Sequence, residues 1–271
     1  MSSVLEDELA DGSLRVWRDG GVATVTLNRP ERHNAINLAM WEAFTPLMAS
    51  LAGDATVDVV VLRGPVGGPF SAGADISEFT TLRSTPESAE RYGEAVTSGE
   101  RAIMTCPKPT VAVVEGFAIG GGAQVALACD LRMCTPAARF GITPAKLGIV
   151  YALQSTARLV EVVGPAWASW ILMTGELVDA ATALRVGLVH EVVEDLEARA
   201  TALTATLSGR ARVSLLGAKA LIRKAASGQR EEDEEVRRHY HDSLHGPEYA
   251  EGVQAFLAKR EPDFRSARQP G

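Results

Sequence analysis

Apolar residues recur along residues 14–134 with two periods: the alternation of half-buried strands and the three-to-four-residue spacing of amphipathic helices. Residues 14–18 and 22–27 alternate around Asp19-Gly20-Gly21, which predicts a β-hairpin. The elements predicted next are a helix at 38–51, a strand at 57–62, a helix at 86–104, a strand at 110–114, a helix at 122–128 and a strand at 131–134. This succession of strands and helices predicts an α/β core.

Beyond residue 193 the pattern becomes helical. Helices are predicted at 194–208, 213–226 and 229–243, and no strand signal returns. We therefore expect an α/β core at residues 1–200 and a separate helical region at residues 201–271.

Composition narrows the class of protein. The 271 residues, 46% of them hydrophobic, are enough to bury a full core. A net charge of −7 argues against nucleic acid or an anionic membrane as the main partner, because both attract a basic surface. Residues 1–12 lack the basic-then-apolar order of a signal peptide, and no apolar run reaches membrane-spanning length, so we expect a cytoplasmic protein.

Cysteine and histidine spacing gives no sign of a metal site. Cys106, Cys129 and Cys134 are an odd number in apolar surroundings without a CxxC pair, which predicts reduced thiols in the core. The five histidines show no ligand spacing near the acidic residues of the core. We expect no bound metal.

Residues 118–130, AIGGGAQVALACD, carry the strongest chemical signal in the chain. Three glycines follow the predicted strand at 110–114 and open an apolar helix. Glycine lets the backbone approach a ligand closely, and the free N–H groups of a first helical turn point at negative charge. A second small-residue loop, FSAGAD at 70–75, follows the predicted strand at 57–62. One N–H donor from each loop would form an oxyanion hole.

Several short sequences, in order along nearly the whole chain, resemble one family. They are NRPERHNAIN at 28–37, FSAGAD at 70–75, EGFAIGGGAQ at 115–124, the Phe140-Gly141 turn, MTGE at 173–176, GLV at 187–189 and AFLAKR at 255–260. Together they resemble the enoyl-CoA hydratase/isomerase (crotonase) superfamily. The resemblance implies a crotonase-like (ClpP/crotonase) spiral of ββα units. It also implies that the C-terminal helices pack against neighbouring subunits in a homotrimer, or in a hexamer made of two trimers.

The resemblance further implies an acyl-CoA site. The backbone N–H groups of Ala74 and Gly121 would hold the thioester oxygen, and CoA would be part of the substrate, with no tightly bound cofactor. The positions implied for CoA binding are Arg29, Arg32, Ala35, Ala72, Phe256 and Lys259. The last two would come from the C-terminal helix, which in many relatives reaches the site of an adjacent subunit.

Two positions depart from the hydratases, in which two glutamates share one water as general base and acid. The first glutamate falls on Gln124, whose neutral amide cannot take a proton near neutral pH. The second falls on Pro144, which offers no polar side chain. Hydration by two glutamates is therefore disfavoured.

The segment TPAKLGIVY at 143–151 instead resembles the methylmalonyl-CoA decarboxylase branch of the family. There a Thr-Pro pair and a tyrosine eight residues after the threonine face the acyl group, so Thr143 and Tyr151 would supply hydroxyl groups. Decarboxylation needs a held carboxylate and a stabilised enolate but no strong base. That branch retains a glutamate where Gln124 stands.

The main expectation is therefore an acyl-CoA enzyme, a decarboxylase-like lyase, that forms a thioester enolate. A first alternative is a hydratase or isomerase whose acid or base has moved, to Tyr151 or to the segment 78–94. A second is a catalytically silent acyl-CoA-binding subunit, which would bind CoA without turnover.

Overall fold

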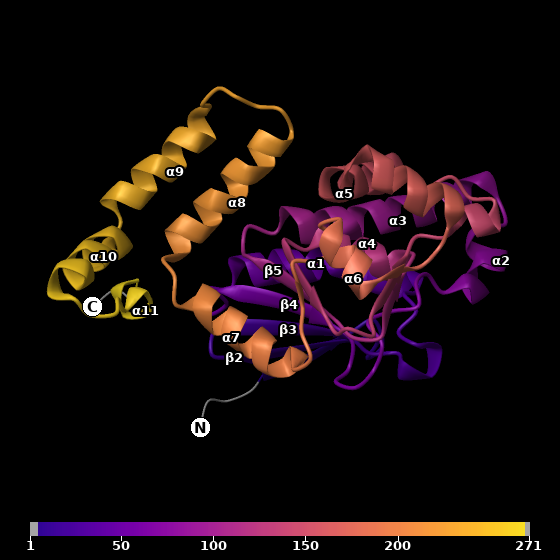
Figure 1. The fold of residues 1–271 in the computed structure, drawn as a ribbon, viewed down its shortest axis with the longest axis horizontal. Coiled ribbons are helices and arrows are strands. Elements are labelled where there is room, and N and C mark those ends of the chain that lie inside the picture. The colour runs from indigo at the N-terminus through magenta and orange to yellow at the C-terminus, as the bar shows by residue number, and fades with distance from the viewer. Residues whose placement is uncertain (1–4, 269–271) are drawn as a thin grey trace.

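In the computed structural model, which describes residues 5–268, the alternating segments form a seven-stranded sheet (Figure 1). In spatial order its strands are β1 (Leu5–Leu9), β2 (Leu14–Asp19), β3 (Val22–Leu27), β4 (Val59–Arg63), β5 (Thr110–Val114), β7 (Leu131–Cys134) and β10 (Glu191–Val192). The first three strands pair antiparallel and the others parallel. The predicted hairpin is present, and both loop glycines, Gly20 and Gly21, have the positive φ that a tight hairpin turn requires.

A second, three-stranded sheet has the order β6 (Phe117–Ile119), β8 (Arg139–Gly141) and β9 (Val178–Asp179). The α-helices are α1 (Leu38–Gly53), α2 (Phe79–Leu82), α3 (Pro86–Thr105), α4 (Gly121–Ala128), α5 (Leu153–Thr174), α6 (Ala180–Arg185), α7 (Leu196–Ser208), α8 (Arg212–Ala226), α9 (Glu234–His245), α10 (Pro247–Ala258) and α11 (Phe264–Ala267). Three 3-10 turns complete the list: η1 (Pro30–Arg32), η2 (Ile76–Glu78) and η3 (Pro144–Leu147).

The central strands β4 and β5 are buried on both faces of the large sheet, and successive side chains of each strand point to opposite sides. Val60 and Leu62 of β4 join the larger core, together with buried residues of α1, α3 and α4. Val59 and Val61 join a smaller core, which α7 covers with Leu196 and Ala200. This smaller core also includes Val111 and Val113 of β5 and Met133 of β7, so α7 packs against the middle of the sheet.

The predicted elements are present with small shifts. The strand predicted at 57–62 begins at Val59, because residues 54–57 close a turn in which the Val57 N–H donates to the Asp54 carbonyl. The helix predicted at 229–243 begins at Glu234, where Asp233 caps it by accepting from the Val236 N–H at 2.9 Å. β1 was not predicted. The expected division at residue 200 falls inside α7, whose second half still packs against the sheet.

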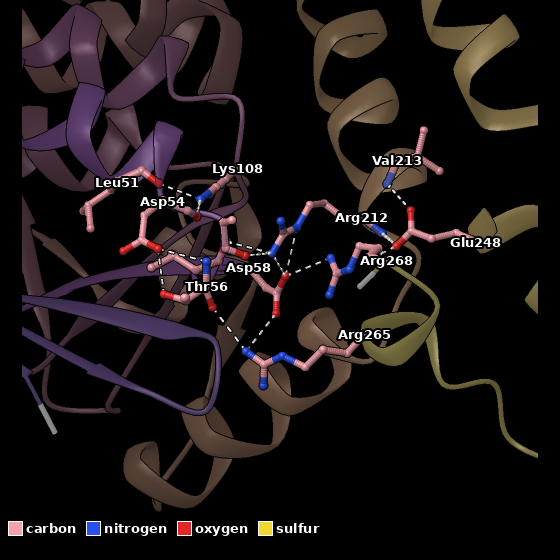
Figure 2. A network of polar contacts seen from close by, with 12 residues as sticks. Leu51, Asp54, Thr56, Asp58, Lys108, Arg212, Val213, Glu248, Arg265 and Arg268 are labelled. Carbon is pink, nitrogen blue, oxygen red and sulfur yellow. Dashed lines mark hydrogen bonds and ion pairs between the residues drawn. The ribbon is translucent and has the colours of Figure 1, made fainter. Parts of the chain in front are cut away.

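The C-terminal helices α8–α11 extend away from the core, beyond the end of α7 (Figure 1). Figure 2 shows how they are tied to it: Arg212, Arg265 and Arg268 converge on Asp58, which precedes β4. Asp58 is 4% exposed. Glu248 of α10 accepts from the Arg212 and Val213 N–H groups at 2.8 and 2.9 Å, so α10 caps the start of α8.

Candidate active site

The glycine run forms the start of α4. Gly120 precedes the helix with φ 49° and ψ −114°, a conformation suited to glycine, and its carbonyl accepts from the Gln124 N–H at 3.0 Å. Gly121 is the first helical residue, so its N–H has no partner within the helix. Within residues 5–268 that N–H donates to no protein acceptor. A backbone donor is therefore left free where the sequence predicts one.

The loop at 70–75 brings a second free donor beside the first. Ala74 forms an isolated β-bridge with Ile36, in which the hydrogen bonds use the Gly73 carbonyl and the Asp75 N–H. The Ala74 N–H itself donates to no described protein group. Gly73 has φ +112°, and a Cβ built on it would lie 3.6 Å from the Gly121 nitrogen. A Cβ built on Gly121 would lie 3.3 Å from the Ala74 nitrogen. The two unpaired N–H groups are therefore neighbours.

The loop at 29–36 is joined to the loop at 70–75. The Ala72 N–H donates to the His33 carbonyl at 2.9 Å, so Ala72 and Ala35 lie on adjoining loops. Ala72 and Arg32 are exposed, and no described partner holds the Arg32 side chain. Both remain available to a nucleotide.

Arg29 has a different environment from the one predicted. Its guanidinium donates to the Ala35 carbonyl at 2.7 Å and pairs with Asp75 at 2.9 Å. Burial opposes ionisation of Asp75, but hydrogen bonds from Ser77 and Arg29 hold the pKa of this carboxyl below its ordinary value. Arg29 therefore ties the two loops together through groups of the chain itself.

The single chain does not bring Phe256 and Lys259 to these loops. Both lie at the C-terminal end of α10, which packs against α9 and α11 at the opposite end of the molecule from α2 (Figure 1). The Phe256 side chain is 82% exposed. A contact between these residues and CoA would require the site of another subunit.

Glu100 of α3 is a buried acid to which none of the sequence motifs pointed. The Gln124 amide donates to the Ser155 hydroxyl at 2.8 Å, and this hydroxyl donates to Glu100 Oε2 at 2.6 Å. Burial raises the pKa of Glu100, while hydrogen bonds from Ser155 and Gln154 and the charge of Arg158 act to lower it. The position of Gln124 thus lacks a carboxyl but is linked to one through a single hydroxyl.

A signal for Glu100 was present in the sequence. Tyr92, Val96 and Ile103 mark the apolar stripe of α3, and Glu100 lies four residues after Val96, on the same stripe. A carboxyl placed there is buried on folding. In contrast, Glu78 accepts from the Leu38 N–H at 2.9 Å and caps α1, and Glu94 is exposed.

Thr143 and Tyr151 flank η3. Thr143 occupies the residue before the turn, but its side chain forms no capping hydrogen bond. The Tyr151 hydroxyl is buried without a described partner, and burial together with the charge of Glu100 raises its pKa well above the ordinary value. Tyr151 is therefore a buried, neutral hydroxyl.

Other features bear on the chemistry in smaller ways. The three cysteines are free and buried, as predicted, and burial raises the pKa of Cys129 and Cys134 to about 12. Over residues 5–268, no group of three His, Cys, Asp or Glu side chains could hold a metal ion. None of the helices in this range is long and apolar enough to cross a membrane.

Comparison with known proteins shows the family to which the chain belongs. The family model described as enoyl-CoA hydratase/isomerase matches residues 18–267, and the chain belongs to this family. A probable enoyl-CoA hydratase, echA8, of Mycobacterium bovis is 35% identical over 256 residues, covering 93% of this chain and 97% of the relative. The short-chain-enoyl-CoA hydratase of Clostridium acetobutylicum is 36% identical over 185 residues, 68% of this chain and 70% of that protein.

Solved structures show the same fold. A putative enoyl-CoA hydratase/isomerase family protein from Hyphomonas neptunium superposes with a TM-score of 0.89 at 34% identity, covering 93% of this chain and 97% of that one. The crotonase-like fold implied by the sequence motifs is thereby confirmed. As a member of this family, the protein is an enzyme of the class that acts on CoA thioesters.

Proposed function

We propose that the protein binds an acyl-CoA and stabilises the negative charge of a thioester enolate between the N–H groups of Ala74 and Gly121. The observation that carries this proposal is that the two N–H groups are neighbours and have no described partner within the chain. Fixed donors aimed at developing charge stabilise the transition state because they need no reorganisation during the reaction. Losing one such donor typically lowers kcat about 100- to 1000-fold.

Among reactions that pass through this enolate, we favour proton transfer of the hydratase/isomerase type over the decarboxylase-like reaction. The curated relatives described above carry hydratase names. A buried carboxyl close to Gln124 also supplies an acid or base that Gln124 and Pro144 cannot. This reaction is the sequence-based alternative with a moved proton-transfer group, except that the group would be Glu100 and not Tyr151 or a residue of the segment 78–94.

Decarboxylase-like lyase chemistry is the second candidate. It is supported by the unpartnered Tyr151 hydroxyl and by the free Thr143 side chain in front of Pro144. Two hydroxyls could hold a substrate carboxylate out of the thioester plane. In this reaction the departing CO2 would leave its electron pair on the same enolate.

We also propose how the rest of the substrate and the subunits are arranged. Arg32 and Ala72, with Ala35, would contact the nucleotide end of CoA, and Arg29 would hold the Ala35 loop in place. Phe256 and Lys259 would reach the CoA of a neighbouring subunit. The helical region after residue 200 would then contribute to a homotrimer, or to a hexamer of two trimers.

The test measures turnover of three substrates: crotonyl-CoA, a β,γ-enoyl-CoA and methylmalonyl-CoA. Each is assayed with the wild-type protein and with the variants Gly121→Pro and Gly121→Ala. Proline removes the N–H, and it suits the first position of a helix. The preceding residue also tolerates it, because φ and ψ of Gly120 have the opposite signs to those of the extended conformation that precedes proline, and glycine adopts both. Alanine adds the same Cβ, 3.1 Å from Trp41, and keeps the donor.

We expect the kcat of Gly121→Pro to be lower than that of Gly121→Ala by about 100-fold or more. If Gly121→Ala retained activity and Gly121→Pro matched it, the role of this N–H would be refuted. Conversion of methylmalonyl-CoA alone would favour the decarboxylase-like reaction. CoA-thioester binding with no turnover of any substrate would contradict both reactions and favour the silent subunit.

A further inference from the structure

Glu100 has the arrangement of a carboxyl that is held at one oxygen and free at the other. Its Oε2 accepts from the Ser155 hydroxyl at 2.6 Å and from the Gln154 amide at 3.3 Å. Its Oε1 is buried and accepts no hydrogen bond from residues 5–268. Glu100 itself is 1% exposed. The fixed oxygen orients the carboxyl, and the free one is left for another group.

The carboxyl belongs to the same part of the molecule as the paired N–H groups. Gln124 lies one turn after Gly121, on the same face of α4, and its amide reaches the Ser155 hydroxyl that holds Glu100. A second link is the Trp41 indole. A Cβ built on Gly99 would lie 3.1 Å from this ring, and a Cβ built on Gly121 would also lie 3.1 Å from it.

A second polar atom is left unpaired in the core. The Tyr151 hydroxyl is, like Glu100 Oε1, buried without a partner among the described residues. Burial and the charge of Glu100 raise the pKa of Tyr151, so this hydroxyl stays neutral. Buried polar groups are almost always hydrogen-bonded, because each unmet group costs free energy. Two such atoms, one of them on the acid linked to the predicted anion site, point to a place for substrate.

We propose that Glu100 takes a proton from the α-carbon of the thioester and delivers it to the γ-carbon, and that the substrates are β,γ-unsaturated acyl-CoA thioesters. This inference rests on the proposed enolate site. Ser155 and Gln124 are positioning residues in it, because they act on the substrate only through Glu100.

The proposed step balances without a co-reactant. The Glu100 carboxylate takes the proton of the α-carbon, and the C–H electron pair forms a double bond to the carbonyl carbon. The carbonyl oxygen takes the negative charge, facing the Ala74 and Gly121 N–H groups. The Glu100 carboxylic acid then returns the proton to the γ-carbon, and the electrons flow back to leave an α,β-unsaturated thioester.

A single carboxyl is sufficient for this double-bond shift, because it gives up in the second half the proton that it took in the first. Hydration by the two-glutamate mechanism needs a second carboxyl at the same water. Gln124 and Pro144 offer none, so the residues of this site suit isomerisation better than hydration.

The experiment uses Glu100→Gln, with Glu90→Gln as the matched control on the exposed face of the same helix. One assay follows conversion of 3-hexenoyl-CoA to its conjugated isomer. A second follows exchange of the α-protons of butyryl-CoA in deuterated water, which requires the base and the enolate but no double-bond shift. Thermal unfolding and butyryl-CoA affinity report whether each variant is folded and binds.

We expect Glu100→Gln to lower both rates about 100-fold or more, with affinity and melting temperature close to wild type. Glu90→Gln should match wild type, and Glu100→Asp should recover part of the exchange rate. Ser155→Ala should lower kcat with little change in KM.

A Glu100→Gln protein that isomerises and exchanges within a few-fold of wild type would overturn this inference. If Gly121→Pro were still impaired relative to Gly121→Ala, the proposed enolate site would survive that result. A wild-type protein that binds butyryl-CoA but exchanges no α-proton would overturn both proposals.

Discussion

Replacing Asp58 with alanine should loosen the attachment of the C-terminal helices. Asp58 Oδ1 accepts from Arg212 Nε and from Arg268 Nη1, each at 3.0 Å, and a second Arg212 nitrogen also donates to it (Figure 2). Arg265 lies 3.7 Å from the other oxygen. These contacts join the start of β4 to α8 and to the segment around α11.

The magnitude follows from the three hydrogen bonds that would be lost. At about 1 kcal/mol net for each bond, Asp58→Ala should cost about 3 kcal/mol. This is the lower end of what removing one partner of a buried ion pair costs, because the arginines that remain can reach water. In a chain of this size, about 3 kcal/mol corresponds to a melting temperature lower by roughly 6–12 °C.

Thermal unfolding measures the total loss, and hydrogen exchange over residues 212–226 and 247–258 locates it. Asp58→Asn keeps a hydrogen-bond acceptor without the charge, so its loss should be intermediate. Asp242→Ala is a suitable control, because that side chain is 56% exposed and contacts His241. If Asp58→Ala melted within 2 °C of wild type, or left exchange in the C-terminal helices unchanged, the reasoning would be refuted.

Three further outcomes are expected. Gly122→Ala should destabilise by about 3 kcal/mol in chemical denaturation, since a Cβ there would lie 2.6 Å from Ser71 Cβ, whereas Gly93→Ala, with open space around it, should be tolerated. Burial lowers the pKa of His190 below 6.5, so its stabilising contribution is present above pH 6.5 and lost as the pH falls; a His190→Asn variant should show a flatter unfolding profile. Burial raises the pKa of Glu100, so the stability that this carboxyl contributes below pH 4.5 is lost as the pH rises through its pKa in the folded protein. The free energy of unfolding of Glu100→Gln should therefore increase with pH relative to that of the wild type.

The sequence predicted those parts of the fold that depend on local periodicity. The strands at 22–27, 110–114 and 131–134 were located to the residue, because short buried runs between turn residues are a local property. β1 was missed, because its pairing with β2 decides its structure more than its own composition does. Beginnings of helices moved where a capping residue decided them, as Asp233 does for α9.

The candidate site was predictable to a different extent for backbone and side-chain groups. The glycine run at 120–122 predicted free N–H groups, because the first turn of any helix leaves its N–H donors without partners inside the helix. The environment of Arg29 was not predictable, since its partner Asp75 lies in another loop and no local pattern pairs them. The position of Glu100 on the apolar stripe of α3 was readable, but its hydrogen bond from Ser155 was not, because α5 supplies that hydroxyl from far along the chain.

The division of the candidate site between main chain and side chains has an evolutionary consequence. An N–H donor such as that of Gly121 is encoded by the conformation of the loop, so nearly every substitution other than proline leaves the atom itself in place. A carboxyl such as Glu100 is encoded by one codon and disappears with one mutation. A lineage could therefore exchange acids between α3 and α4, passing through variants with no acid, and keep its affinity for the enolate throughout. Diversification of reaction on this scaffold would then proceed by relocating one side chain at a time over an unchanged main-chain framework.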